Sequence, residues 1–156
     1  MRGVDLEPLA RLVYRLQQPY VESLTLEMCR ESVNHVVDKR EVQYAILTGL
    51  TLDIMAEEGR LDEPLASILR RNPPLYGVDE VLALTIVNAY GSIGLSNFGF
   101  LDEEPPAELL QAMPAGENRV NTFLDDILAA VVAAACARLA HRTPDSRPGR
   151  PPGDGL

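Results

Sequence analysis

Two pairs of adjacent acidic residues are the clearest candidates for chemistry in this sequence. Asp79 and Glu80 occur in "LYGVDEVLAL", Asp125 and Asp126 occur in "NTFLDDILAAVV", and each pair precedes a run of apolar residues. Ionised carboxylates are costly beside such a surface unless something pairs with them. If both segments are helices that pack side by side in parallel, the four carboxylates meet at one end of a bundle. Such an oxygen cluster would hold a hard divalent cation such as Mg²⁺.

Helix capping is the alternative explanation of the same acids. Thr122 and Asp125 match a capping box, and the helix dipole favours acids in a first turn, which applies equally to Asp79 and Glu80. Asp53 is a further acid, and it lies among apolar residues in the stretch "LTGLTLDIMAEEG". We expect it to be exposed to solvent, or else to be a further ligand or an acceptor behind the ligands. The sequence leaves these alternatives open.

Two segments are candidates for contact with a phosphate group. The stretch "YGSIGLSNFG" reads as a loop, and its backbone amides near Ser92 and Gly94, together with Asn97, would face an anion. It lacks the ending of a P-loop, so a plain connection between helices is the competing interpretation. Lys39 and Arg40, at a predicted helix junction, would meet an anion or belong to the solvated surface.

Histidine and cysteine give no sign of a second kind of site. His35 and His141 lie far apart without ligand spacing, so we interpret them as surface or packing residues. Cys29 and Cys136 both fall in helix-like segments, which predicts buried, reduced thiols. The sequence therefore supports neither Ser-His-Asp catalysis nor a zinc site.

The overall composition is typical of a soluble globular protein. Of the 156 residues, 46% are apolar and 24% are charged, with a formal net charge of −9. This charge argues against nucleic-acid binding and against unaided binding to anionic lipid. The charge-poor run 127–140 is too short to cross a bilayer, and no signal peptide is visible. We expect a cytoplasmic protein without a transmembrane segment and with at most transient membrane contact.

Apolar residues recur at helical spacing along almost the whole chain, which predicts an all-α single-domain bundle of about six to seven helices. The alanine-rich C-terminal segment is expected at its centre, because small side chains let neighbouring helices approach closely. Residues 1–142 form the predicted domain, and the Pro- and Gly-rich residues 143–156 a disordered tail. The first predicted helix ends near Gln18, the second is capped by Thr25, and the third runs from Lys39 to Glu58. A short fourth helix is capped by Asp62, and the fifth runs from Val78 to Tyr90. The sixth lies in "PPAELLQAM", and the seventh runs from Thr122 to His141.

The segments "LYGVDEVLAL", "YGSIGLSNFGFLD" and "VNTFLDDILAAVVAAACARLAHR" resemble the phosphatidylglycerophosphatase A family, and most closely its small soluble branch. The resemblance begins at Lys39 and ends at Arg142. It implies an all-α, Mg²⁺-dependent phosphatase of lipid metabolism, whose membrane members remove the terminal phosphate of phosphatidylglycerophosphate. This chain differs from those members in reading "DEEPP" where they carry a Lys-Pro, and in lacking their membrane-spanning hydrophobicity.

The resemblance also implies roles for particular residues. The family's acidic pairs fall on Asp79 with Glu80 and on Asp125 with Asp126, which would bind one or two Mg²⁺ ions. The metal would neutralise phosphoryl oxygens and activate a water for attack on phosphorus. The family's single Asp falls on Asp102, which would orient that water or assist the leaving group. The candidate phosphate-binding residues are Lys39, Arg40, Ser92, Gly94 and Asn97.

Three functions follow from these observations. The first is a Mg²⁺-dependent phosphatase acting on phosphatidylglycerophosphate, and the second is the same chemistry on a water-soluble phosphate monoester. The third is a non-catalytic helical protein that binds a metal ion or a phosphorylated metabolite, either as a monomer or as a homo-oligomer. The phosphatase is the main prediction, and the acidic surface and the missing basic clamp fit the non-catalytic alternative.

Overall fold

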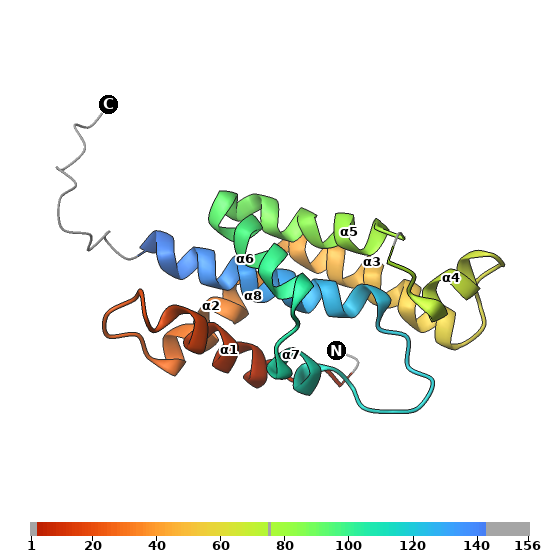
Figure 1. Ribbon diagram of the computed structural model, residues 1–156, viewed down its shortest axis with the longest axis horizontal. Helices are drawn as coiled ribbons and strands as arrows, with labels where there is room; N and C mark the ends of the chain where they lie inside the picture. Colours follow the sequence, from red (N-terminus) through yellow and green to blue (C-terminus); the bar gives the residue numbers. More distant parts are fainter. Residues whose placement is uncertain (1–2, 75, 143–156) are drawn as a thin grey trace.

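The computed structural model describes residues 3–74 and 76–142, and in these ranges it contains helices and no strand. Figure 1 shows them as a single elongated bundle. This confirms the predicted all-α, single-domain fold. The elements are α1 (Glu7–Gln17), α2 (Leu26–Val37), α3 (Arg40–Glu57), α4 (Leu65–Arg71), α5 (Val78–Val87), the 3-10 turn η1 (Asn88–Tyr90), α6 (Gly91–Glu103), α7 (Ala107–Ala112) and α8 (Thr122–Arg142).

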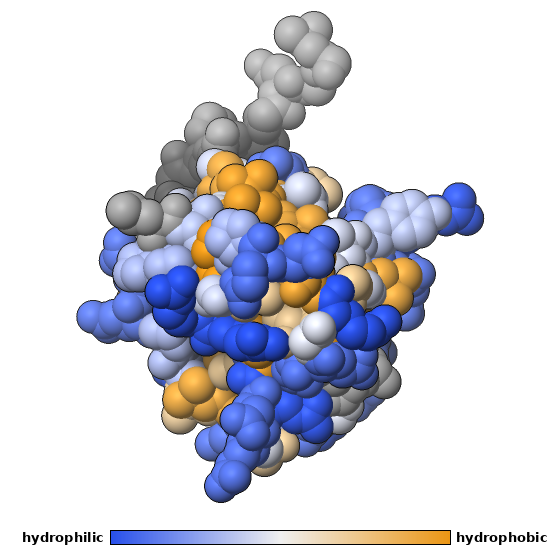
Figure 2. Space-filling view, turned by 90° about the vertical axis from the view of Figure 1, so that its right-hand side faces the viewer, coloured by the Kyte–Doolittle hydropathy of each residue, from blue (hydrophilic) through white to orange (hydrophobic). Residues whose placement is uncertain are grey.

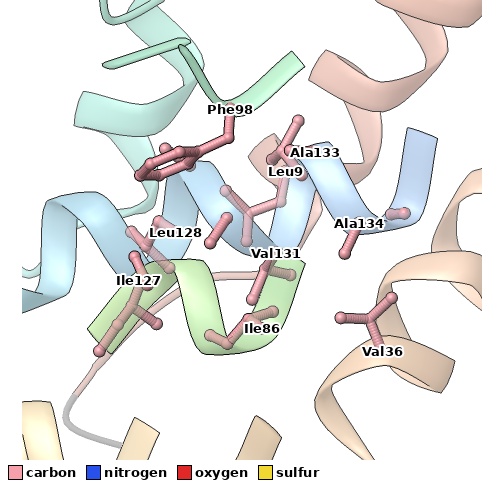
Figure 3. Packing of buried hydrophobic residues seen from close by; sticks show 14 of the residues in the cluster. Leu9, Val36, Ile86, Phe98, Ile127, Leu128, Val131, Ala133 and Ala134 are labelled. Carbon is pink, nitrogen blue, oxygen red and sulfur yellow. The ribbon is translucent and has the colours of Figure 1, made fainter. Parts of the chain in front are cut away.

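Helix α8 is the centre of the bundle, as the alanine-rich sequence predicts. Nearly all of its side chains from Thr122 to Ala137 are buried, and α1, α2, α3, α5 and α6 all pack against it. In Figure 3, Leu9 of α1, Val36 of α2 and Phe98 of α6 surround its side chains. The alanines keep the helix narrow, so that neighbours approach its backbone: the Ser32 hydroxyl of α2 donates a hydrogen bond of 3.0 Å to the Ala135 carbonyl.

The direction of the helices decides where the acidic residues lie. Figure 1 shows α5 and α8 beginning at the same end of the bundle and running in parallel, whereas α3 runs the opposite way. Helices α3, α5 and α8 meet at Gly49, where an added Cβ would lie 2.6 Å from Ile127 Cδ1, 2.9 Å from Phe123 Cβ and 3.3 Å from Leu82 Cδ2. The close approach at Gly49 therefore fixes α3 and α5 against the first turns of α8.

Two helix starts show what local sequence predicts well and badly. The Thr25 hydroxyl accepts the Met28 amide at 3.2 Å, so the predicted cap of α2 is confirmed. The predicted cap at Asp62 is wrong, because α4 begins only after Pro64 and Glu63 instead accepts the Ser67 amide at 3.1 Å.

The glycine-rich segment 91–99 is the main correction to the predicted fold. It is not a loop but the first part of helix α6. The chain turns at Gly91, whose φ of 72° is a conformation that favours glycine. Gly94 then lies in the helix, where an added Cβ would be 3.0 Å from Val87 Cγ1. Glycine here permits close packing of α6 on the end of α5 and does not signal an irregular segment.

The stretch Val78–Glu103 is the one helical stretch in the described ranges that is long and apolar enough to cross a membrane, judged by length and composition. The turn at η1 and Gly91 divides it into α5 and α6, and both helices pack against α8. Cys29 and Cys136 are buried free thiols, as predicted. The predicted disordered tail, 143–156, lies outside the described residues.

Gly49 offers a direct test of this packing. Gly49→Ala is expected to lower the free energy of unfolding by about 1–3 kcal/mol, because its new methyl group collides with Phe123 and Ile127. The matched control is Gly99→Ala in α6, where nothing lies within 4 Å of an added Cβ. The control should stabilise the protein by up to about 1 kcal/mol through helix propensity. Urea denaturation measures both, and equal effects would contradict the packing.

Candidate metal centre

Asp53 of α3 caps the N-terminus of α8. Its side chain is fully buried, and its two carboxylate oxygens accept the backbone amides of Phe123, at 3.1 and 3.2 Å, and of Leu124, at 3.0 Å. The first amides of a helix have no partner within the helix and carry the positive end of its dipole. A buried carboxylate therefore satisfies both, and it joins the middle of the chain to the start of the central helix.

Two further contacts hold the same segment. Glu57, one helical turn after Asp53, accepts the Val120 amide at 2.7 Å, and the Thr122 hydroxyl donates to the Leu69 carbonyl of α4 at 2.6 Å. Helices α3 and α4 thus fix the entry of the chain into α8. The direction of the first turn of α8 is set by contacts from two other helices.

These contacts correct two expectations. Asp53 is not exposed to solvent, and its buried carboxylate acts as the acceptor for α8. The capping box between Thr122 and Asp125 does not form, because Thr122 donates to Leu69 and Asp125 Oδ1 accepts the Asp126 amide at 2.9 Å. Capping is supplied from another helix, so the acidic pair on α8 is left without that role.

The two acidic pairs have the same local arrangement at the starts of α5 and α8. Asp79 Oδ1 accepts the Glu80 amide at 3.0 Å, as Asp125 Oδ1 accepts the Asp126 amide. The side chains of Asp79 and Asp126 are buried, each residue being 7% exposed, whereas Glu80 is exposed. One acid of each pair is therefore held in the bundle, where the two helices pack together.

The acids act on one another electrostatically. Burial first, and then the charges of Asp125, Asp79 and Asp102, raise the pKa of Asp126 to about 9, and a side-chain hydrogen bond with Asp102 adds to the effect. Burial also raises the pKa of Asp125 to about 7, with contributions from Asp79, Asp53 and Asp102. The starts of α5 and α8 and the end of α6 therefore converge, and we call Asp79, Asp102, Asp125 and Asp126 the acid cluster.

Glu80 lies at the edge of the acid cluster. Its pKa is raised by burial and by the charges of Asp102 and Asp79. Among the described residues, no lysine or arginine contributes to the pKa shifts of Glu80, Asp125 or Asp126. Burial and neighbouring carboxylates thus raise the pKa values of Glu80, Asp125 and Asp126, and no basic side chain in the described ranges offsets this effect.

The chemistry of this donor set fits a hard divalent cation. Carboxylate oxygens are the ligands that Mg²⁺ prefers, and a cation would relieve the repulsion that raises the pKa values. In residues 3–74 and 76–142, no three His, Cys, Asp or Glu side chains are arranged closely enough to hold an ion. Asp79 and Asp125 direct an oxygen to a backbone amide, so coordination by both would require rotation of their side chains. The metal-ligand roles stay predictions.

The predicted phosphate-binding residues lie apart from the acid cluster. Lys39 Nζ lies 4.3 Å from the centre of the Tyr90 ring, so Lys39 and the adjacent Arg40 are at the opposite end of α5 from Asp79. Ser92 is exposed in the first turn of α6, and Gly94 is buried in that helix. Within one chain, these residues therefore do not lie beside the acid cluster, and their position does not support the phosphate-binding roles.

Three polar groups near these elements have no hydrogen-bond partner in the part of the chain that the structure describes. They are the amide nitrogen of Asn97, the amide oxygen of Asn121 and the hydroxyl of Tyr90, all buried. Sequence reasoning singled out Asn97 but missed Asn121 and also Tyr76, whose ring packs edge-on against Phe123 at 6.0 Å. Burial and the charges of Asp79 and Asp53 raise the pKa of Tyr76. In the sequence, only the position of Tyr76 three residues before Asp79 could have indicated this.

The protein is therefore an all-α helical bundle with acidic residues gathered at the starts of two parallel helices. The family model for phosphatidylglycerophosphatase A matches residues 9–141. The chain belongs to the phosphatidylglycerophosphatase A family, which confirms the resemblance in the sequence. Family membership indicates a phosphatase-related role.

Relatives and solved structures agree with this assignment. The chain is 51% identical over 141 residues to the uncharacterized protein YutG of Bacillus subtilis (strain 168), covering 90% of this chain and 85% of YutG. A solved protein of unknown function from Bacillus stearothermophilus is 57% identical, with a TM-score of 0.85 over 92% of this chain and 89% of that one. The low temperature requirement C protein from Listeria monocytogenes is 51% identical, with a TM-score of 0.80 over 90% and 88% of the two chains.

The role of Asp53 as a cap yields a stability prediction. Asp53→Ala should lower the free energy of unfolding by about 2 kcal/mol or more, because buried amides of Phe123 and Leu124 lose their acceptor. Asp53→Asn retains one oxygen acceptor and should recover part of the loss. Thermal unfolding followed by circular dichroism measures the series, and an Ala variant as stable as the wild type would contradict the capping role.

The acid cluster predicts an unusual dependence of stability on pH. With its pKa raised to about 9 in the folded protein and an ordinary value of 3.8, Asp126 binds a proton on folding between these values. Stability of the metal-free protein should therefore fall as pH rises from about 4 to 9. Asp126→Asn should be more stable than the wild type at pH 8, by at least ~1 kcal/mol, and this gain should vanish near pH 4.

Chemical denaturation at pH 5 and pH 8 in the presence of a chelator measures this difference. Glu22→Gln is the control, because it removes one carboxylate from an exposed position outside the acid cluster. A wild type whose stability rises between pH 5 and pH 8 would show that Asp126 is ionised in the folded protein.

Proposed function

We propose that the protein is a Mg²⁺-dependent phosphatase that hydrolyses a phosphate monoester at the acid cluster. The observation that supports this most strongly is the convergence of Asp79, Asp102, Asp125 and Asp126 from three helices in a member of a phosphatase family. Capping does not account for the pair on α8, because Asp53 already serves the amides of that helix.

The buried acids are suited to bind the ion. Asp79 and Asp126 lie on adjacent parallel helices and are almost fully buried. Their side chains therefore lose little conformational entropy when they bind an ion. Asp125 and Glu80 are more accessible and would complete the set from the solvent side. A bound Mg²⁺ supplies positive charge against the phosphoryl oxygens and makes water more acidic.

Asp102 is the candidate for proton transfer. It lies near the end of α6, is exposed, and shares a hydrogen bond with Asp126. A carboxylate in this position would accept a proton from the attacking water or orient that water toward phosphorus.

The substrate in this proposal is phosphatidylglycerophosphate or a soluble phosphate monoester. The family supports the lipid, and the net charge of −9 is unfavourable for contact with an anionic membrane surface. A non-catalytic protein that binds Mg²⁺ or a phosphorylated metabolite is the second candidate. The placement of Lys39 and Arg40 away from the acid cluster of the same chain favours that candidate.

Phosphate release tests the proposal. The wild type with Mg²⁺ should release phosphate from phosphatidylglycerophosphate in mixed micelles or from a member of a panel of soluble phosphoesters. Asp126→Asn should lower the rate by about 100-fold or more because the ion loses a ligand. Glu22→Gln, which changes the net charge equally, should retain the wild-type rate.

Each outcome separates the candidates. Turnover of the micellar lipid alone identifies a lipid phosphatase, and turnover of a soluble ester alone identifies a soluble substrate. Equal rates for Asp126→Asn and the wild type would refute the role of the acid cluster. Mg²⁺ binding measured by calorimetry, without turnover of any ester, would favour the non-catalytic protein.

A further inference from the structure

Basic side chains gather at the end of the bundle opposite the acid cluster, where α5 and α8 end in Figure 1. His35 lies in the last turn of α2, Lys39 directly precedes α3, and Arg138 and Arg142 lie near the end of α8. The charge of Arg138 is the largest cause of a lowered pKa at His35. Burial and the charges of Lys39 and Arg142 lower it further, and Asp38 opposes them less strongly. We call His35, Lys39, Arg138 and Arg142 the basic cluster.

The side chain of Tyr90 lies beside the basic cluster and is buried, at 7% exposed. Lys39 Nζ is 4.3 Å from the centre of its ring. Burial and the charge of Arg142 lower the pKa of Arg138, whereas Tyr90 raises it, so the phenol lies near this guanidinium. The Tyr90 hydroxyl has no hydrogen-bond partner among the described residues. Burying such a group unpaired costs free energy, and an anion held by Lys39 and Arg138 would be its acceptor.

Carboxylates of the described residues do not neutralise the basic cluster. Asp38 and Glu31 act on it, but they have the smallest effects on the pKa values of His35 and Arg138. Lys39 and Arg138 are half-buried, and within residues 3–74 and 76–142 neither forms a salt bridge. Half-buried cations that lie close together repel one another, and a bound anion would remove this repulsion.

The helix dipole is the alternative explanation of these cations. His35 and Arg142 lie in the last turns of α2 and α8, where positive charge is favourable. The dipole does not explain why a buried hydroxyl at Tyr90 lacks an acceptor. The two explanations also differ in their consequences, because only an anion site responds to added anion by saturable binding.

Solvent reaches two members of the basic cluster through an open pocket. Arg138 and Arg142 line this pocket, which has a volume of about 270 Å³ and lies between α2 and α8. Glu22 and Glu31 also line it. Their negative charges repel an anion from that part of the pocket, so the favoured position for an anion is toward Lys39.

We propose that the basic cluster and the Tyr90 hydroxyl form a binding site for a phosphate group, separate from the acid cluster. A phosphate dianion is favoured over a carboxylate, because its oxygens can accept hydrogen bonds from two guanidinium groups, an ammonium group and a hydroxyl at once. Free phosphate and small phosphate monoesters share this chemistry. The site does not depend on the phosphatase function, and it is expected equally in a non-catalytic protein.

An NMR titration of the metal-free protein locates the site. At about pH 8, where phosphate is mainly a dianion, inorganic phosphate should give saturable shifts of the backbone amides of His35, Lys39, Tyr90 and Arg138, with a Kd of about 1 mM or lower. Sodium chloride at the same ionic strength should give none. Because no Mg²⁺ is present, the result is independent of any phosphatase activity.

Glycerol 3-phosphate, titrated in parallel, distinguishes the two sources of the phosphate group. Tighter binding of glycerol 3-phosphate than of inorganic phosphate would identify a monoester as the ligand. Equal affinities would show that the phosphate group alone is recognised.

Substitutions test the residues of the site. Arg138→Gln should weaken phosphate binding by about 10-fold or more, because charge-assisted hydrogen bonds are lost. Tyr90→Phe should weaken it by about 5-fold without lowering thermal stability in the absence of phosphate, because it removes only an unpartnered hydroxyl. The matched control is Arg71→Gln on α4, at the end of the bundle that faces the viewer in Figure 2, where hydrophilic residues cover much of the surface. This control should bind phosphate as the wild type does.

The outcomes decide between the anion site and the helix dipole. Equal phosphate affinities of Arg138→Gln and the wild type, or shifts confined to the starts of α5 and α8, would overturn the proposal. So would the lack of any saturable shift with both probes up to about 10 mM, a concentration that detects millimolar binding. If Arg138→Gln does not fold, Lys39→Gln replaces it, with the same expected loss of affinity and the same contradicting result.

Discussion

The hydrogen bonds from the first amides of α8 to the buried carboxylate of Asp53 are the constraint on which the rest of the structure depends. They connect a residue in the middle of α3 to the start of the central helix, and they satisfy donors that would otherwise be buried and unpaired. Because Asp53 takes this role, the acids that follow on α8 are free to face Asp79 of α5 and Asp102 of α6. One long-range cap thus fixes the fold and also positions the acid cluster.

The acid cluster works against the stability of the folded chain. Burial and mutual repulsion raise the pKa values of Asp125 and Asp126, so ionised carboxylates there are unfavourable when no cation is bound. Burial of the large apolar core around α8 offsets this unfavourable contribution to the free energy of folding. Groups that are costly to the fold and gathered at one place are typical of functional sites, and a divalent cation would turn the same repulsion into binding energy. The acidic pairs that the resemblance implies as ligands and the carboxylates with raised pKa values therefore lie at the same end of the bundle.

The sequence predicts most of the helices because periodicity and local caps are local properties. Thr25 and Gly59 mark their helix ends correctly, and the alanines of α8 predict a central helix. The errors arise where a distant contact decides. Gly94 reads as loop in isolation, but the proximity of Val87 requires glycine within a helix. Asp53 reads as exposed because its partners, Phe123 and Leu124, lie far along the chain. The acid pairs are visible in the sequence, whereas their convergence requires the parallel packing of α5 and α8.

The most direct test of the central claim is a crystal structure with Mn²⁺ in place of Mg²⁺, because manganese scatters anomalously and has similar ligand preferences. The account predicts an anomalous peak between the side chains of Asp79 and Asp126, with their carboxylates turned toward it. Crystals at saturating Mn²⁺ that show no peak at the starts of α5 and α8 would contradict the account.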